Sequence, residues 1–489
     1  MNETKEYNLI DEPWIPVLMK SGGNRTVSLG EVFGDNSGDI ADLALNPYER
    51  VAVFRLLLCI AQAALGSGRL KDETAWLAIK DDVGPFSMAY LKKWHDRFFL
   101  YGSQAFLQPD CIAYAKSEGS SSCDKLILHL ATGNNSTLYD HEAVGGSRCL
   151  SDARLALGLL VYQNFSSGGL SGQCIWDGIL TRKQIQAAPC RERSMLFSIV
   201  LGSSILDTIW LNIVTDDWIL NSLKTEMGKP FWEEGELKRA LTAGNEKTYL
   251  GHLVPFSRAI KLTRKSPFCV LGEALSYPQI PAWREPMASI KLQKGSKKNE
   301  FTETYVSSNP ARMPWRELSS ILSIRETGGR KSALALRHID TLNEKDFTLW
   351  TGGLYSEKAK EVATVEWMAK LSVSLLENSA MHLYEEAVAV ADWQRSCLYF
   401  ASAEYAQKMC VEEVFRFVTP TERIYWDLLS MPENQRLVQS VQSPTYKEDW
   451  CIAVRRAAEE AYHRICPSAT ARQMEAYAQG FSKLTIRKD

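Results

Sequence analysis

The 489-residue sequence lacks the features of a membrane or secreted protein. It holds no run of about 18 apolar residues, the length that crosses a bilayer. The opening residues, MNETKEYNLI, lack the apolar core of a signal peptide. None of its 11 cysteines forms a CxxC pair, which argues against a zinc ribbon and fits a reducing compartment. We therefore expect a soluble, cytoplasmic protein without structural zinc and without contact with a membrane.

A large charge of one sign is also missing, because the formal net charge is −2. A protein that binds nucleic acid with its whole surface is usually strongly basic. Any nucleic-acid contact of this chain must therefore come from local basic segments. The composition, with 45% hydrophobic and 23% charged residues, is that of a globular protein, and the length predicts two or three domains.

The motifs of common enzyme classes are absent as well. The sequence has no GxxxxGK[ST] phosphate loop, no HExxH and no GxSxG. His129 and His141, the latter between Asp140 and Glu142, are the best candidates for metal ligands, but a metal site needs three or four converging ligands. Carboxylate pairs such as Glu233–Glu234 are typical of a solvated surface. We therefore predict no catalytic residue, no cofactor and no metal, and an enzyme with an unrecognised active site remains an alternative.

Two regions of different patterning divide the chain. Residues 1–360 mix helix and strand signals, among them a predicted helix at 46–65 and alternating residues at 289–306. Over residues 361–489 the apolar positions recur with helical spacing, which predicts a bundle of about four helices. The predicted fold class is therefore α+β, with a mixed N-terminal domain at 1–360 and a C-terminal four-helix bundle at 361–489.

Three segments stand out within the first region. The loop NFSSGGLSG at 164–172 follows a predicted helix at 152–163, and its glycines let the backbone approach a partner closely. The predicted hairpin at 289–306 carries lysines, and the predicted turn at 325–339 carries arginines and a lysine. Taken singly, each segment is best interpreted as a connector or a solvated turn. Together, such basic loops can form one phosphate-contacting face.

Several phrases of the sequence occur in the order found in one known family. They are NLIDEPWIPV, NPYERVAVFRLLLCIAQAAL, RFFLYGSQAFLQPD, GGSRCLSDARLALGLLVYQNFSSGGLSG, PAWREPMASIKLQKG, SSNPARMPW and LWTGGLY. With these phrases the chain resembles the CasA family, the large subunit of the type I-E CRISPR surveillance complex Cascade. The resemblance covers roughly residues 7–489, and the C-terminal bundle matches by architecture more than by motif.

The resemblance implies a non-catalytic subunit that works without a cofactor in antiviral defence. Its implied function is to recognise the protospacer-adjacent motif (PAM) in double-stranded target DNA, to promote duplex opening and R-loop formation, and to help recruit the effector nuclease. The implied partners are the 5′ handle of the CRISPR RNA, the target DNA, the backbone, small and handle-binding Cascade subunits, and a helicase–nuclease effector.

The resemblance also assigns PAM contacts to the first two segments. A glycine-rich loop of the family meets the PAM in the minor groove, which is only about 6 Å wide and admits backbone better than bulky side chains. The matching residues here are Ser166, Ser167, Gly168 and Gly169. A family hairpin with a PAM-contacting lysine matches 289–306, where Lys294 is the first choice and Lys291 the second.

The third segment, 325–339, matches the family's wedge hairpin, which separates the first base pair beside the PAM. The wedge glutamine of the family has no counterpart here, since the sequence has no glutamine between Gln293 and Gln394. Apolar side chains can also unstack bases. The residues assigned to the tip are Leu334 and Ala335, and those assigned to DNA contacts beside it are Arg330, Lys331 and Arg337.

One further contact follows from the resemblance, and a second is a separate hypothesis. The stretch 132–142 matches a loop that reaches toward the RNA handle and the neighbouring subunit, with Asn135, Leu138 and Tyr139 as contacts, and Tyr139 can stack on a base. In the bundle, Arg455 and Arg456 are candidates for binding the displaced strand. The alternative within the same complex is a structural scaffold without direct DNA reading.

Overall fold

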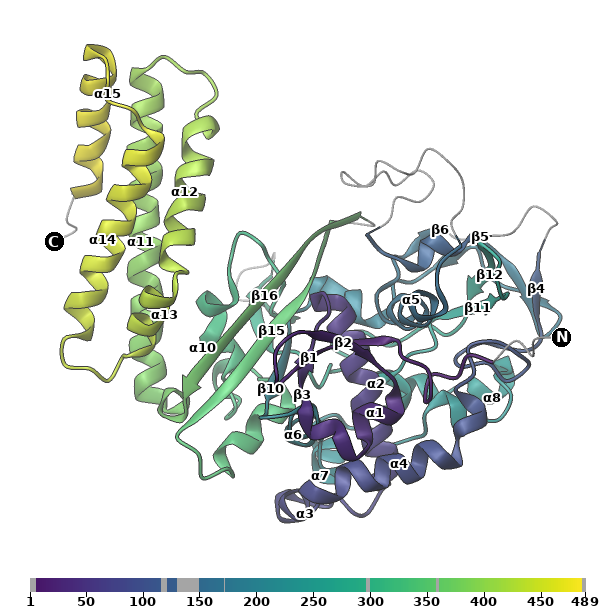
Figure 1. The fold of residues 1–489 in the computed structure, drawn as a ribbon. Coiled ribbons are helices and arrows are strands. Elements are labelled where there is room, and N and C mark those ends of the chain that lie inside the picture. Colours follow the sequence, from purple (N-terminus) through teal and green to yellow (C-terminus); the bar gives the residue numbers. More distant parts are fainter. Residues whose placement is uncertain are drawn as a thin grey trace. The chain divides into compact units, whose positions relative to one another are not determined.

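The computed structural model describes residues 6–115, 121–129, 149–170, 172–295, 300–357 and 360–485. The chain divides into two compact units, Met1–Lys370 and Leu371–Asp489. It is 48% helical and 19% strand, with helices and small sheets mixed in the first unit and helices in the second. This arrangement confirms the predicted α+β class (Figure 1).

A nearly buried helix, α2 (Pro47–Leu65), forms the centre of the N-terminal unit. It begins with a capping box in which Asn46 and Glu49 bond each other's backbone N–H groups, and it ends at Gly66, which has a positive φ of 71°. The helix packs against α4, α5, α9 and strand β15, so almost every one of its faces is covered. The helix predicted at 46–65 is therefore confirmed.

Shorter helices surround α2 in this unit. They are α1 (Leu29–Phe33), α3 (Glu73–Ala78), α4 (Val83–Lys93), α5 (Asp152–Phe165), α6 (Ile205–Leu211), α7 (Asp216–Asn221), α8 (Arg239–Thr242), α9 (Tyr249–Leu253) and α10 (Leu318–Ile321). Several begin where the sequence offers a capping side chain: the hydroxyl of Ser151 accepts the N–H of Arg154 and thereby caps α5.

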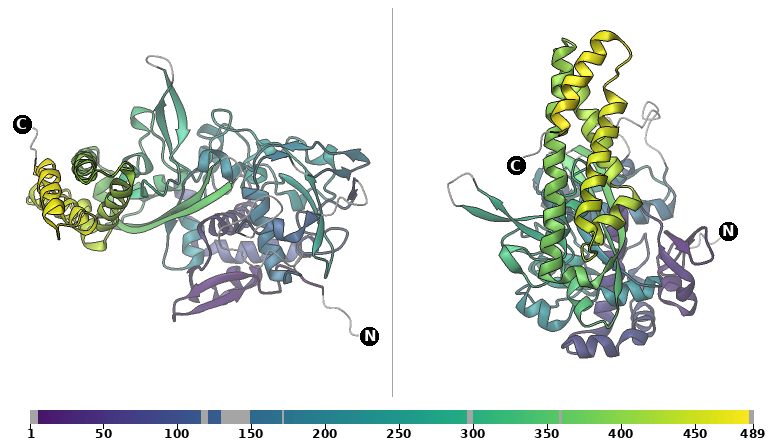
Figure 2. Two further views of the ribbon diagram at one scale, coloured as in Figure 1. Left: turned by 90° about the horizontal axis from the view of Figure 1, so that it is seen from above. Right: turned by 90° about the vertical axis from the view of Figure 1, so that its left-hand side faces the viewer.

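The strands form small, separate sheets. Their orders are β2–β1–β3, β10–β15–β16, β11–β12–β5, β4–β7–β8, β6–β9 and β13–β14. Their bounds are β1 (Ile15–Met19), β2 (Asn24–Val27), β3 (Ile40–Leu43), β4 (Ile112–Tyr114), β5 (Ser121–Ser122), β6 (Gly169–Leu170), β7 (Cys174–Trp176), β8 (Ile179–Leu180), β9 (Gln184–Ile185), β10 (Phe197–Leu201), β11 (Arg258–Leu262), β12 (Phe268–Glu273), β13 (Ile290–Lys294), β14 (Phe301–Tyr305), β15 (Asp346–Glu357) and β16 (Lys360–Ser372). Both views of Figure 2 show the β13–β14 hairpin (teal) projecting from the unit, which confirms the hairpin predicted at 289–306.

The C-terminal unit is a four-helix bundle in which the second helix is broken. Its helices are α11 (Asn378–Lys408), α12 (Phe415–Leu429), α13 (Pro432–Gln439), α14 (Tyr446–Ile465) and α15 (Ala471–Phe481). The central helix α11 packs against α12, α14 and α15, and α13 continues α12 after a break at Ser430–Met431. Buried aromatic rings fill the core and place their polar atoms on backbone carbonyls, as when Tyr425 donates to Ala391 at 2.8 Å.

The prediction of helix from residue 361 onward was wrong for the first dozen residues. Residues 360–372 form strand β16, which pairs with β15, and the second compact unit begins at Leu371. Along β16 the exposed positions alternate with covered ones, and Val365 and Leu371 are buried on one face. This period of two, with β-branched residues at Val362 and Thr364, is the pattern of a half-buried strand.

Among the described helices, none is both long and apolar enough to cross a membrane.

Candidate nucleic-acid interface

The glycine-rich loop is a short two-stranded ribbon at the end of α5. Gly169 pairs with Ile185 and Leu170 pairs with Gln184, so β6 and β9 form the two arms of the loop. Gly169 is exposed, has a φ of 113°, and has open space where a side chain would stand. The position therefore favours glycine for its backbone conformation rather than for a packing contact.

The serines at the base of this loop differ in exposure. Ser166 is fully buried, and its carbonyl accepts the N–H of Ala188 at 2.9 Å. Ser167 and Gly168 are half-buried. The burial of Ser166 contradicts its predicted place among the DNA contacts, because this residue ends α5 and closes the base of the loop. The outward-facing part begins after it.

A buried arginine braces both arms of the loop from behind. Arg258, at the start of β11, is 2% exposed. One of its guanidinium nitrogens, Nη2, donates to the carbonyls of Ser167 at 3.1 Å and Gln186 at 2.7 Å, and Nη1 donates to Ser257 at 2.9 Å. Burial lowers the pKa of Arg258 to about 10, so the group still carries its charge at neutral pH. These hydrogen bonds tie the backbone at Ser167 and Gln186, at the two sides of the loop, to the start of β11.

A kinked segment, Pro189–Ser194, joins this loop to two hairpins. Arg191 Nη1 donates to the carbonyl of Phe165 at 3.2 Å and pairs with Glu361 of β16 at 2.5 Å. Ser194, which has a positive φ of 50°, exchanges hydrogen bonds with Ser356 of β15. Its carbonyl also accepts the N–H of Ser308, just beyond β14, at 2.7 Å. The end of α5, the β15–β16 hairpin and the base of the β13–β14 hairpin therefore meet at one segment.

The two lysines predicted on the β13–β14 hairpin have different environments. Lys294 is exposed and pairs across the ladder with Phe301, a residue that is 60% exposed. Lys291 is half-buried and pairs with Glu317 at 2.9 Å. Lys291 and Arg312 together lower the pKa of Glu317 and overcome the opposing effect of its burial. The charge of Lys291 is thus offset within the fold, and Lys294 is the lysine that faces outward.

The segment 325–339 does not form the predicted wedge hairpin. It contains 3₁₀ turns at Thr327–Gly329 and Leu334–Asp340 instead of paired strands. Leu334 and Ala335 are buried, with exposures of 0% and 7%, because this apolar run packs into the core of the unit. This burial contradicts the assignment of the two residues to an exposed wedge tip.

The basic residues of this segment are engaged by the protein itself. The backbone of Lys331 bridges to Ile290 beside the β13–β14 hairpin, and its ammonium pairs with Glu303 at 2.5 Å. Arg337 pairs with Glu326 and donates to the hydroxyl of Ser222. Arg330 is half-buried. The structure thus brings the segment to the base of the hairpin, but it uses Lys331 and Arg337 to hold the fold.

The remaining predicted sites are of two kinds. Asn135, Leu138 and Tyr139 lie outside the described residues, as does His141. Arg455 and Arg456 lie on α14 and are both exposed.

The His129 ring lies within hydrogen-bonding distance of the Tyr48 hydroxyl and the Arg154 guanidinium. Within the described ranges, no three His, Cys, Asp or Glu side chains gather as metal ligands would.

Sequence reasoning missed Arg258 and the basic pair Arg182–Lys183. The pair is exposed and immediately precedes β9, so it lies beside the glycine loop. The sequence does contain a signal for the pair, because TRKQ places two adjacent basic residues in the segment that follows the glycines. No local signal identifies Arg258, which lies 91 residues from Ser167.

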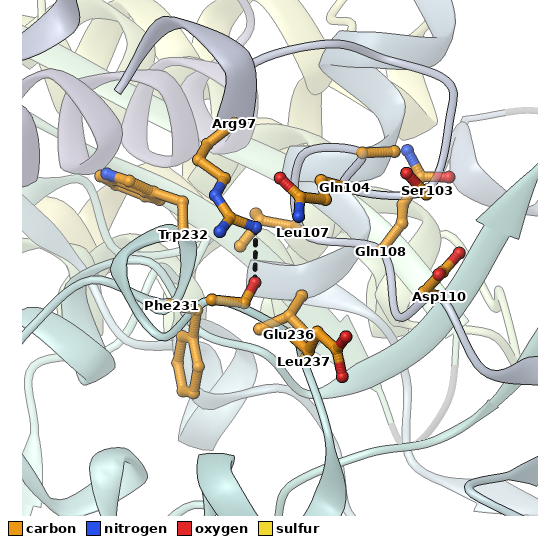
Figure 3. A pocket seen from close by; sticks show the side chains of 12 residues that line it. Arg97, Ser103, Gln104, Leu107, Gln108, Asp110, Phe231, Trp232, Glu236 and Leu237 are labelled. Atoms are coloured by element: carbon orange, nitrogen blue, oxygen red, sulfur yellow. Dashed lines mark hydrogen bonds between the residues drawn. The ribbon is translucent and has the colours of Figure 1, made fainter. Parts of the chain in front are cut away.

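The phrase RFFLYGSQAFLQPD has a structural role. Gln108 donates to the carbonyl of Leu100 at 2.7 Å and accepts the N–H of Leu262 at 2.8 Å, which ties the phrase to β11. A pocket of about 190 Å³ lies between this phrase and residues 231–237 (Figure 3). Arg97 reaches across it to the carbonyl of Gly235 at 2.6 Å.

Comparison with known proteins places the whole chain in one group. Residues 8–461 match the family described as CRISPR-associated protein Cse1. The CRISPR-associated protein CasA/Cse1 of Thermus thermophilus is 28% identical, with 98% of this chain and 97% of the relative aligned.

Solved structures agree in fold. A crystal structure of Thermus thermophilus CasA superposes with a TM-score of 0.78 at 24% identity, and that of Thermobifida fusca Cse1 with 0.78 at 18%, each over 98% of both chains. A chain of a CRISPR RNA-guided surveillance complex superposes with a TM-score of 0.75 at 16% identity, over 98% of this chain and 99% of that one. With its fold and nearly its whole length matched, the chain belongs to the Cse1 (CasA) family, the large subunit of type I-E Cascade.

Proposed function

We propose that this chain is a non-catalytic subunit that recognises the PAM in duplex DNA for a guide-loaded surveillance complex. Its partners are the CRISPR RNA with its 5′ handle, the target DNA, and the backbone, small and handle-binding subunits. A solved relative of the same fold is itself part of a CRISPR RNA-guided surveillance complex. We also propose that the protein is cytoplasmic, that it promotes duplex opening, and that it helps recruit a helicase–nuclease.

The observation that carries the proposal is the exposed glycine loop that Arg258 braces from behind. A minor groove about 6 Å wide leaves little room for side chains, and Gly169 offers bare backbone on an outward-facing turn. The donors and acceptors in that groove separate A·T from G·C pairs only coarsely. Reading by this loop is therefore permissive, which is adequate where the guide RNA reads the target sequence.

The other residues divide according to their environment. We propose that Ser167, Gly168, Gly169 and Lys294 contact the PAM duplex, with Lys291 and Arg330 behind them. Since Leu334 and Ala335 are buried, duplex opening is assigned to no residue of that run. In the remainder of the chain, Asn135, Leu138 and Tyr139 contact RNA and a neighbouring subunit, and Arg455 and Arg456 of the helical bundle bind the displaced strand.

The test is duplex binding over a randomised PAM library by the guide-loaded complex, with and without this subunit. We expect PAM-dependent binding that requires the subunit and that Gly169→Val reduces at least tenfold. Gly102→Val is the matched control, because Gly102 has a φ of 112° and equally open space for a side chain. Both variants therefore carry the same kind of backbone strain, about 1–3 kcal/mol.

Each rival interpretation predicts a different result. If the subunit is a scaffold that does not read DNA, the complex has the same PAM preference with and without it. The Gly169→Val variant then behaves like Gly102→Val. If the chain is a hydrolase with an unrecognised active site, the purified subunit degrades DNA when a divalent metal is added. Either result overturns the proposal.

A further inference from the structure

We propose that Arg182 and Lys183 contact the DNA phosphates that flank the groove entered by the glycine loop. The inference rests on the proposed function and adds to it a second, sequence-independent contact. Phosphate contacts supply affinity and register, and base edges supply specificity. The basic pair would therefore position the loop on the duplex without influencing which PAM it prefers.

The fold fixes the basic pair on both sides. Before it, Thr181 is buried, donates its N–H to the carbonyl of Cys174 at 2.9 Å, and accepts the N–H of Cys174 on its hydroxyl at 3.0 Å. After it, Gln184 is already paired with Leu170 in the loop ribbon. Only two residues lie between these anchors, so the backbone of the pair is held beside the loop.

The spacing suits the flanks of a narrow groove. Lys183 lies two residues before Ile185, which pairs with Gly169. Two Cα–Cα steps of about 3.8 Å and a cross-strand Cα distance of about 5 Å keep its Cα within about 13 Å of that of Gly169, since the backbone bends at Lys183. A groove about 6 Å wide has a phosphate backbone along each wall. When the backbone of Gly169 lies inside the groove, the long side chains of Arg182 and Lys183 are thus at the level of the phosphates along one wall.

The local charge also fits a polyanion. Arg182 and Lys183 are both exposed. Between residues 164 and 190 the sequence contains one acidic residue, Asp177, whose carboxylate accepts the backbone N–H of Arg239 at 2.7 Å. The segment 164–190 therefore carries two basic residues, Arg182 and Lys183, against one acidic residue.

The test compares Arg182→Gln/Lys183→Gln with wild type in the assembled, guide-loaded complex. Each lost phosphate contact lowers the slope of log K against log salt by about 0.9, so we expect a decrease of about 1.8. The same relation gives roughly a 60-fold loss of duplex affinity at 0.1 M salt. The rank order of PAM sequences should stay as in wild type, and the subunit should enter the complex normally.

Lys92→Gln/Lys93→Gln is the matched control. These two lysines are also adjacent and exposed, at the end of α4, which Figure 1 places well away from β6. We expect their replacement to leave the salt slope unchanged.

Four results would overturn the inference: the first three leave the proposed function standing, and the fourth refutes both. An unchanged slope in the Arg182→Gln/Lys183→Gln complex refutes the phosphate contacts alone, provided that wild-type binding requires the subunit. An altered PAM order shows that the pair reads bases. Failure of the variant to enter the complex shows that the pair binds a protein subunit. Wild-type binding that does not need the subunit refutes the proposed function and this inference together.

Discussion

Replacing Arg258 by methionine tests whether the glycine loop binds DNA as a preformed structure. The variant removes the two hydrogen bonds that hold the carbonyls of Ser167 and Gln186. A hydrogen bond to a charged group contributes about 1.5–3 kcal/mol. The two lost bonds therefore remove about 3–6 kcal/mol of the interaction free energy that holds the loop in place. The unfolding free energy should fall by less than this, because burying the guanidinium costs several kcal/mol that the variant no longer bears.

Duplex affinity should respond more than stability does. The strand pairs of β6 and β9 and the bond from Ala188 to Ser166 still hold part of the loop. A loop that spends less time in its binding shape weakens affinity in proportion. We expect about a tenfold loss of PAM-duplex affinity, equivalent to about 1.4 kcal/mol. Arg258→Lys keeps the charge with a less suitable donor geometry and should fall between wild type and Arg258→Met.

The assay is duplex binding by the assembled complex, with thermal unfolding of each variant subunit measured in parallel. Arg55→Met is the matched control, because Arg55 is also fully buried and donates to the carbonyls of His252 and Leu253. Its loss leaves Glu285 buried without its partner and should cost about 3–5 kcal/mol of stability. The folded Arg55→Met subunit should nevertheless bind duplex normally. If Arg258→Met binds as wild type does, or loses affinity only as much as Arg55→Met, the bracing argument is refuted.

Three further predictions concern other parts of the chain. Leu334→Ala should cost about 2–5 kcal/mol of stability while the folded subunit opens duplexes normally; a selective loss of opening with intact stability would restore the wedge assignment. Burial raises the pKa of Glu192, which accepts the N–H of Ile280 at 3.1 Å, to about 7. Because this pKa lies above the ordinary 4.5, the folded chain holds the proton more tightly, and that stabilisation is complete below about pH 4.5 and lost as the pH rises through 7. Glu192→Gln should therefore flatten the profile of Tm against pH over this range, and a profile parallel to wild type would contradict the prediction. Arg455→Glu/Arg456→Glu should shorten R-loop lifetime and spare PAM binding, and equal lifetimes would remove these residues from the displaced-strand contact.

The parts of the fold that the sequence predicted are those fixed by local chemistry. Asn46 and Pro47 mark the start of α2, and Ser151 marks the start of α5, because capping groups act within one turn of the helix they begin. The bundle could be predicted because helical spacing persists over long stretches with little glycine. The β13–β14 hairpin could be predicted from alternation on both sides of a turn.

The errors arose where tertiary packing decides between two local patterns. Residues 361–372 contain apolar residues that fit both a helical and an alternating period, and pairing with β15 selects the strand. In 325–339 the basic residues suggested an exposed turn, whereas the apolar run at Leu334–Leu336 is buried in the core. Their charges are then used internally, as in the pair of Lys331 with Glu303. A charge count along the sequence does not separate a basic residue that faces solvent from one that has a partner across the fold.

The glycine loop shows why its sequence alone gave only part of the site. Glycines make close approach to a groove sterically feasible, but a chain of glycines and serines loses much conformational entropy when it is ordered on a ligand. Here the fold already holds residues 166–170 of the loop, through the β6–β9 pairs, the closure at Ser166 and the guanidinium of Arg258. Permissive reading of PAM sequences would then come from a rigid backbone that meets a degenerate groove, rather than from a flexible loop that adapts to each sequence. The two cases differ in Arg258→Met, since a loop that works by flexibility would lose nothing when its brace is removed.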